Sequence, residues 1–137
     1  MKMLLAAVLS AGILCQAPAF AQAPKKTVAP PAVQQEFTAF IAKFRAALKA
    51  NDPAAVAALT KLPFMADASI SDAAQFRAKT YRELLDAKTR ACIQRTKAIY
   101  DRDGESNDFY YIFCGETIFT FTRTPTGFLF TDVGVND

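Results

Sequence analysis

The chain has 137 residues, with 16 Lys and Arg against 13 Asp and Glu, a formal net charge of +3 and no histidine. This length fits one domain once a targeting segment is set aside. The small net charge does not favour a nucleic-acid partner, and the lack of histidine excludes Ser-His-Asp and Cys-His catalysis and the commonest zinc sites.

Residues 1–21 have the layout of a cleavable signal peptide. Lys2 provides the positive charge, an apolar run follows from residue 4 to residue 14, and Ala19-Phe20-Ala21 forms a small-x-small cleavage site. The apolar run is shorter than the about 20 residues that cross a bilayer. We therefore expect export to the periplasm, cleavage near Ala21 and no stable membrane insertion.

Residues 22–31 include the segment PKKTVAPP, which is rich in proline and poor in apolar side chains. Such a composition favours an extended backbone that does not pack. We expect a tether over 22–31 and one folded domain over 32–137.

Residues 32–50 are predicted to form a long helix, because apolar side chains recur at helical spacing on one face. These side chains are Val33, Phe37, Phe40, Ile41, Phe44 and Leu48. Asn51 is a plausible left-handed stop, and Asp52-Pro53 is a cap followed by a proline at the first helical position. A short helix over 54–59, ended by Pro63, would complete an αα-hairpin.

Two less regular segments follow. Residues 62–65 are predicted to be extended and to pack under the long helix. Residues 72–88 are predicted to be helical after a capping-box-like spacing at 69–72, with irregular spacing at 78–80 that suggests a break into two pieces.

From residue 91 the composition becomes rich in aromatic and β-branched residues, which favours strands. We predict strands over 96–100, 109–114, 117–123 and 128–133, with turns at Asp103-Gly104 and at 125–127. Gly115 is either a hairpin turn or a bulge, and we favour the turn. The predicted fold class is α+β: N-terminal helices packed on a curved C-terminal antiparallel sheet of three to four strands.

Cys92 and Cys114 remain after signal cleavage, and export favours a disulfide between them. A two-residue turn at Asp103-Gly104 would place Cys92 opposite residue 115, within reach of Cys114 after a bulge or slipped register. The alternative is two free thiols, one on the helical side and one on a strand.

The sequence contains no glycine-rich phosphate loop and no EF-hand spacing, and we expect no cofactor, no metal and no catalytic residue. The acidic residues at 101–108 are interpreted as a solvated turn. A basic excess at 77–97 is interpreted as a solvated surface, with a patch for an acidic ligand, lipid head group or protein as the alternative.

Strand alternation places apolar side chains on both faces of the predicted sheet. One face must pack on the helices, and we expect the other to form a concave pocket, a dimer surface or a partner-binding face. The candidate ligand-binding residues are Tyr110, Glu116, Phe119, Phe121 and Arg123.

The layout resembles the NTF2-like, cystatin-like α+β cone. The stretches that carry the likeness are EFTAFIAKFRAALKANDPAAVAALTKLPF and DFYYIFCGETIFTFTRTPTGFLFTDVGVND. The resemblance implies a cone with an interior pocket and, often, a homodimer through the sheet. Enzymes of that family place Asp, His or Tyr inside the cone, and this chain has no matching constellation.

The leading hypothesis is a non-enzymatic exported domain that binds a small apolar ligand or a peptide on the concave sheet face. One alternative is a protein-interaction role, such as an inhibitor or immunity-type protein, which a charged loop over a filled sheet would favour. The other is an enzyme of unknown class, which a buried carboxylate beside a tyrosine with a perturbed pKa would favour.

Overall fold

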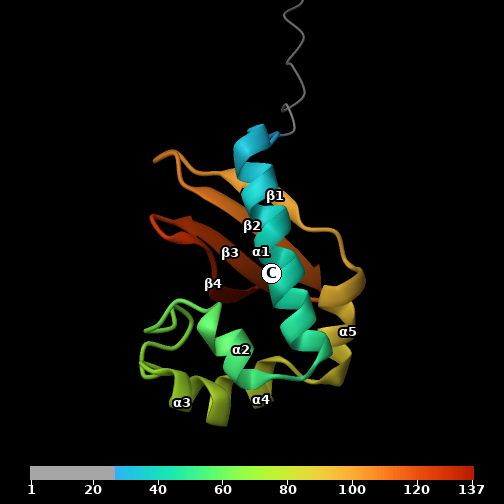
Figure 1. Ribbon diagram of the computed structural model, residues 1–137, viewed down its shortest axis with the longest axis vertical. Coiled ribbons are helices and arrows are strands. Elements are labelled where there is room, and N and C mark those ends of the chain that lie inside the picture. The colour runs from blue at the N-terminus through green and yellow to red at the C-terminus, as the bar shows by residue number, and fades with distance from the viewer. Residues whose placement is uncertain (1–26) are drawn as a thin grey trace, which may run out of the picture.

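The computed structural model describes residues 27–137, so the predicted signal peptide and residues 22–26 of the predicted tether lie outside the described residues. Helices precede a four-stranded antiparallel sheet, which confirms the α+β class (Figure 1). The elements are α1 (Pro31–Lys49), α2 (Pro53–Ala58), α3 (Ala73–Gln75), a π-helical turn η1 (Phe76–Thr80), α4 (Tyr81–Leu84), α5 (Ala87–Arg95), β1 (Ile99–Arg102), β2 (Asp108–Cys114), β3 (Thr117–Thr124) and β4 (Gly127–Val135).

The α1 helix and the corner after it follow the sequence pattern. All six apolar side chains of the predicted stripe are buried, together with Ala47. Asn51 adopts a positive φ of 50°. The Asp52 carboxylate accepts hydrogen bonds from the backbone N–H groups of Ala54 and Ala55, at 3.1 and 3.0 Å, and so caps α2.

The segment after α2 differs from its prediction. The helix ends at Ala58, well before Pro63, because the chain turns to follow β4: Lys61 N–H donates to the Phe130 carbonyl and Phe130 N–H to the Leu59 carbonyl, both at 2.8 Å. Residues 62–65 therefore lie beside β4, and they form bends where an extended segment was predicted. Phe64 is buried there, with its ring centroid 5.2 Å from that of Phe130.

The predicted 72–88 helix is divided, but at a different place. Residues 76–80 form a π-helical turn without breaking the chain direction, and the break falls at Leu85-Asp86. The Asp86 carboxylate accepts from Thr89 N–H at 2.8 Å and starts α5. That helix continues to Arg95, because Ile93 is drawn into the core, and the first strand begins at Ile99 instead of residue 96.

The sheet is a meander in the order β1-β2-β3-β4. The first turn is longer than predicted: Arg102 pairs with Asp108, and Asp103 organises a 103–107 loop by accepting from the N–H groups of Glu105 and Asn107 at 2.9 Å. At the second turn Cys114 pairs with Thr117 and Gly115 has a φ of 63°, which confirms a hairpin turn.

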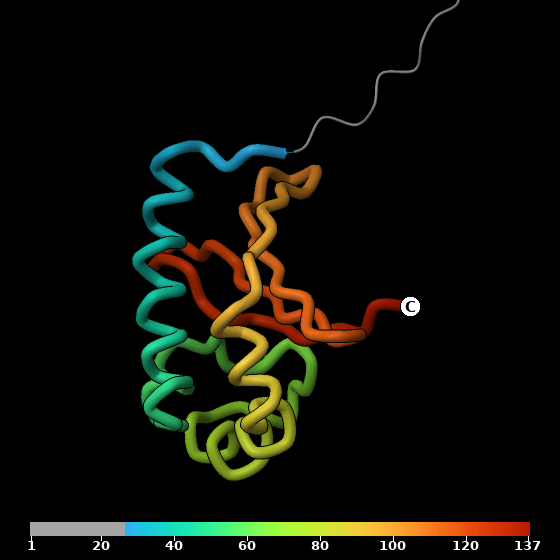
Figure 2. The backbone as a smooth tube through the Cα atoms, turned by 90° about the vertical axis from the view of Figure 1, so that its right-hand side faces the viewer, coloured from blue at the N-terminus to red at the C-terminus, as the bar shows by residue number. Residues whose placement is uncertain are grey.

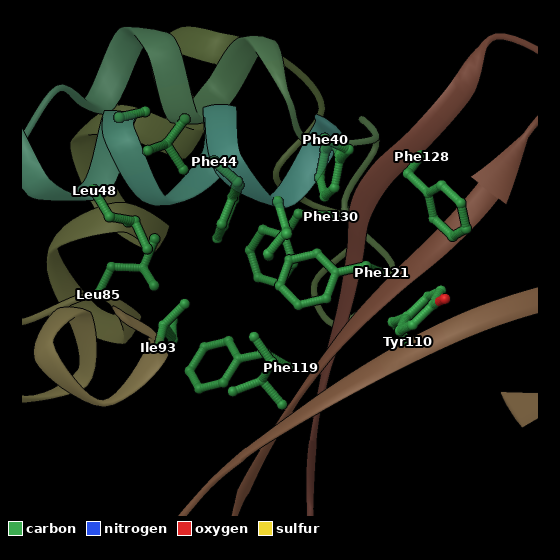
Figure 3. Close-up of a cluster of buried hydrophobic side chains, with 14 of the residues drawn as sticks. Phe40, Phe44, Leu48, Leu85, Ile93, Tyr110, Phe119, Phe121, Phe128 and Phe130 are labelled. Carbon is green, nitrogen blue, oxygen red and sulfur yellow. The ribbon is translucent and has the colours of Figure 1, made fainter. Parts of the chain in front are cut away.

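One face of the sheet packs against α1, and we call it the inner face. Figure 3 shows its aromatic side chains meeting those of the helix. Phe121 lies at the centre, with its ring centroid 5.2 Å from Phe44 and 5.8 Å from Phe40. Phe130 lies 5.6 Å from Phe44. Such tilted and edge-on pairs add to the free energy gained from burial.

A disulfide joins Cys92 in α5 to Cys114 at the end of β2, with a Cα–Cα distance of 6.0 Å. The predicted pairing is confirmed, but the predicted geometry, with the two cysteines opposite each other across a β-hairpin, is wrong. The two cysteines do not face each other across a hairpin; a helix packed on the sheet end brings them together.

Reduction of the disulfide should lower the melting temperature by roughly 10 °C, because a bridge across 22 residues constrains the unfolded chain by about 3 kcal/mol. Thermal unfolding with and without reductant measures this. A Cys92→Ser/Cys114→Ser variant should melt at the lower temperature in both conditions. An identical melt of the native chain before and after verified reduction would contradict the expectation.

Candidate functional site

The inner face of the sheet is solidly filled over β3 and β4. Phe119, Phe121 and Phe130 have no exposed surface. They occupy the space under α1 to which the resemblance to the NTF2-like cone assigns an interior pocket (Figure 3). A ligand on this part of the face would have to displace the core.

The structure separates the five predicted ligand-binding residues. Phe119 and Phe121 belong to the core and offer no surface to a ligand, because the inner face is the one that α1 covers. Glu116 is exposed in the β2–β3 turn. Arg123 is exposed and forms an ion pair with Glu36 at 2.7 Å. Of the five, Tyr110 alone lines a groove between α1 and β1.

A groove of about 980 Å³ runs between α1 and β1. It exists because α1 packs against α2, α5 and β4, so that the β1 side of the inner face is left open. In Figure 2 the segment before α1, in blue, leads away from the top of the helix toward the side of the molecule on which the sheet lies. Its lining residues are Thr27, Val28, Ala29, Gln34, Phe37, Thr38, Ile41, Arg45, Lys97, Ala98, Ile99, Tyr100 and Tyr110.

The groove has a rigid aromatic floor. The ring of Tyr110 stacks on that of Phe37 with a centroid separation of 3.6 Å and an interplanar angle of 2°. Tyr100 lies beside it, with its centroid 5.3 Å from that of Tyr110. Burial raises the pKa of the Tyr110 hydroxyl, and the charge of Asp108 adds to this, so the phenol stays neutral. The groove is therefore preformed and mostly apolar.

Arg45 and Lys97 supply the charge of the groove, and no acidic side chain within residues 27–137 lines it. Arg45 Nε donates to the Ile93 carbonyl at 3.0 Å and Nη2 to the Thr96 carbonyl at 2.7 Å. Within residues 27–137 it forms no ion pair. The sequence pattern did not single out Arg45, because it lies outside the apolar stripe of the helix and nothing in the spacing indicated that α5 would pack there.

A second polar cluster adjoins the groove. Asp108 is 4% exposed. It accepts from the Tyr100 hydroxyl at 2.6 Å and from Arg102 Nε at 2.9 Å, and Arg123 lies 3.6 Å away. The first β-turn determines this cluster, because it places Asp108 opposite Arg102.

The Asp108 cluster is poorly suited to proton transfer. Burial acts to raise the pKa of Asp108, but the hydrogen bonds from Arg102 and Tyr100 and the charges of Arg102 and Arg123 outweigh it, so the pKa lies below its usual range. Burial, the hydrogen bond to Asp108 and its charge raise the pKa of Tyr100. At neutral pH the carboxylate stays ionised and the phenol stays protonated, which makes the cluster a brace between β1, β2 and β3.

The outer face of the sheet is mixed. Its apolar side chains include Ile99, which is 54% exposed, and Phe113, which is 38% exposed. A smaller hollow of about 480 Å³ lies there, where Phe109 and Tyr111 meet Thr120, Thr122 and Asp132. The predicted homodimer through the sheet would use this face, and it stays a prediction.

Residues 27–137 contain neither a cluster of metal-binding side chains nor a helix that could span a membrane. No group of three or more His, Cys, Asp or Glu side chains in this part of the chain could hold a metal ion. No helix that the structure describes is long and apolar enough to cross a membrane.

Comparison with known proteins finds no matching family, no matching curated protein and no matching solved structure. The function is therefore inferred from the geometry of the groove.

Asp108→Asn should lower the free energy of unfolding at pH 7 by about 1–3 kcal/mol, because the charged partner of two arginines and a tyrosine is lost. Since folding lowers the pKa of Asp108, its contribution is complete above about pH 4 and is lost as the pH falls through the folded-state value. The difference between the native chain and the variant, measured by urea unfolding, should shrink at low pH. Glu105→Gln, in the exposed 103–107 loop, is the control and should differ little from the native chain at either pH.

Phe121→Ala should cost about 3–5 kcal/mol of stability, as expected for a fully buried phenylalanine. Chemical unfolding measures this loss. A variant of native stability would show that the core does not depend on Phe121, and would restore it as a candidate ligand contact.

Proposed function

We propose that this domain is an exported, non-enzymatic binding module that holds a small apolar ligand or an apolar peptide segment in the groove between α1 and β1. The site occupies only the β1 side of the sheet face expected from the sequence, because the part of that face over β3 and β4 is filled by the core. Export rests on the signal-like residues 1–21, and the NTF2-like resemblance remains part of the proposal.

The observation that carries the proposal is the groove itself. Its volume of about 980 Å³ lies at the upper end of the range for small-molecule sites, which runs from about 300 to 1,000 Å³. Its walls are mainly apolar and aromatic, and the Phe37–Tyr110 stack holds the floor in place. Such walls favour apolar ligands, because binding removes their surface from water without reordering the protein.

The two alternatives have weaker support. A buried carboxylate beside a tyrosine would favour the enzyme hypothesis, and Asp108 with Tyr100 is such a pair. The direction of both pKa shifts, however, disfavours proton transfer. The inhibitor hypothesis asked for a charged loop over a filled sheet; the exposed 103–107 loop is charged, but Asp103 uses its carboxylate to hold the loop together.

Blocking the groove tests the proposal. Thr38 is exposed on α1 and lines the groove, so Thr38→Trp should fill the cavity without disturbing the core. The neutral apolar fluorophore N-phenyl-1-naphthylamine should bind the native chain and bind the variant at least tenfold more weakly. Since the chain has no tryptophan, the new indole also reports by energy transfer whether dye reaches the groove.

Ala39→Trp is the matched control, because Ala39 is exposed on α1 beside Thr38 but does not line the groove. This variant should bind the dye like the native chain. Equal binding by both tryptophan variants, or no binding by the native chain, would contradict the proposed function.

A further inference from the structure

We propose that the ligand of the groove is an anionic amphiphile, with an apolar acyl chain lying along α1 and a carboxylate held by Arg45 and Lys97. This inference rests on the proposed function and specifies the chemistry of its ligand. It follows from the distribution of charge in the groove and from the shape of its walls.

The first argument is the unbalanced positive charge. In the part of the chain that the structure describes, Arg45 and Lys97 are the cations of the groove, and no carboxylate lines it. Arg45 is half-buried, and its hydrogen bonds from Nε and Nη2 go to backbone carbonyls, which carry no formal charge. No residue within 27–137 accepts a hydrogen bond from Arg45 Nη1 or from the Lys97 ammonium. A ligand carboxylate would gain charge-assisted hydrogen bonds there.

The second argument is that Arg45 is held in place. The carbonyls of Ile93 and Thr96 belong to the C-terminal end of α5, where the helix dipole favours a cation. The Gln94 side chain also donates to the Arg45 carbonyl at 2.7 Å. The guanidinium is therefore positioned before a ligand arrives, and little side-chain entropy is lost on binding.

The third argument concerns the rest of the groove. From Gln34 to Arg45 the helix rises by about 16 Å, a span that suits a medium-length acyl chain. The wall between these ends presents Phe37, Thr38 and Ile41. The Thr38 hydroxyl already donates to the Gln34 carbonyl at 2.8 Å.

An acyl chain fits these walls better than a peptide does. Each peptide unit brings an N–H and a carbonyl group that need partners when they are buried. The α1 wall offers few such partners, and β1, whose outer edge is unpaired among the described strands, is only four residues long. An acyl chain has no such requirement, and each buried methylene contributes to binding.

Calorimetric titration of the full chain with dodecanoate and with dodecanol tests the inference. The two probes have the same chain and differ in the charge of the head group. We expect dodecanoate to bind at least tenfold more tightly. We expect Arg45→Gln to weaken dodecanoate binding by about 10- to 100-fold, as for a hydrogen bond to a charged group, and to leave dodecanol binding nearly unchanged.

Lys97→Gln is a second test that remains valid if the Arg45 variant does not fold. Lys97 is exposed and makes none of the hydrogen bonds that hold α5. The substitution should weaken dodecanoate binding by about two- to fivefold, in line with an exposed ion pair. Lys43→Gln changes the same charge on the exposed side of α1, away from the groove, and should have no effect.

Each outcome separates this inference from the proposed function. Equal affinities for dodecanoate and dodecanol, both blocked by Thr38→Trp, would overturn the carboxylate assignment and leave groove binding intact. Binding of a short alternating Val-Ala peptide but not of dodecanoate would overturn the acyl chain. Failure of every probe, the neutral dye included, would overturn the proposed function itself.

Discussion

The contact between α1 and the inner face of the sheet is the interaction on which the rest of the structure depends. Phe37, Phe40 and Phe44 recur at helical spacing, and their rings meet those of Phe121, Phe128 and Phe130 on β3 and β4. Close packing of rigid rings leaves few alternative arrangements, because a shift of either layer would open a cavity or produce a clash. The position of α1 over the sheet is thereby determined.

The same contact creates the candidate site. A helix that covers β3 and β4 cannot also cover β1, so a groove remains where Tyr100 and Tyr110 continue the aromatic layer beyond the helix. Two further constraints define its ends. The Cys92–Cys114 disulfide ties α5 to the sheet, which places the carbonyls of Ile93 and Thr96 beside Arg45. The Asp108 cluster braces β1 against β2 and β3 and keeps the sheet wall in position.

The differences between prediction and structure have a common physical cause. The first strand begins at Ile99 instead of residue 96, because a cap at Asp86 and burial of Ile93 favour a helix up to Arg95. The first β-turn contains five residues, because Asp103 satisfies the backbone of a wider loop. The prediction of Phe119 and Phe121 as ligand contacts is wrong, because both are buried in the core. Strand alternation groups side chains by face but does not determine which face α1 will cover.

Because Cys92 and Cys114 are the two cysteines outside the predicted signal peptide, the sequence by itself determined the choice of disulfide partners. It also determined the helices around Asn51 and Asp52, the order of helices before strands and the Gly115 turn. These depend on local spacing, capping and turn chemistry, which neighbouring residues carry. Tertiary structure alone decided which sheet face is filled, where the groove lies and that Arg45 stands in it without an acidic partner. Those features arise where α1, α5 and β1 meet, and residues as distant along the chain as Arg45 and Thr96 come together only when the whole core packs.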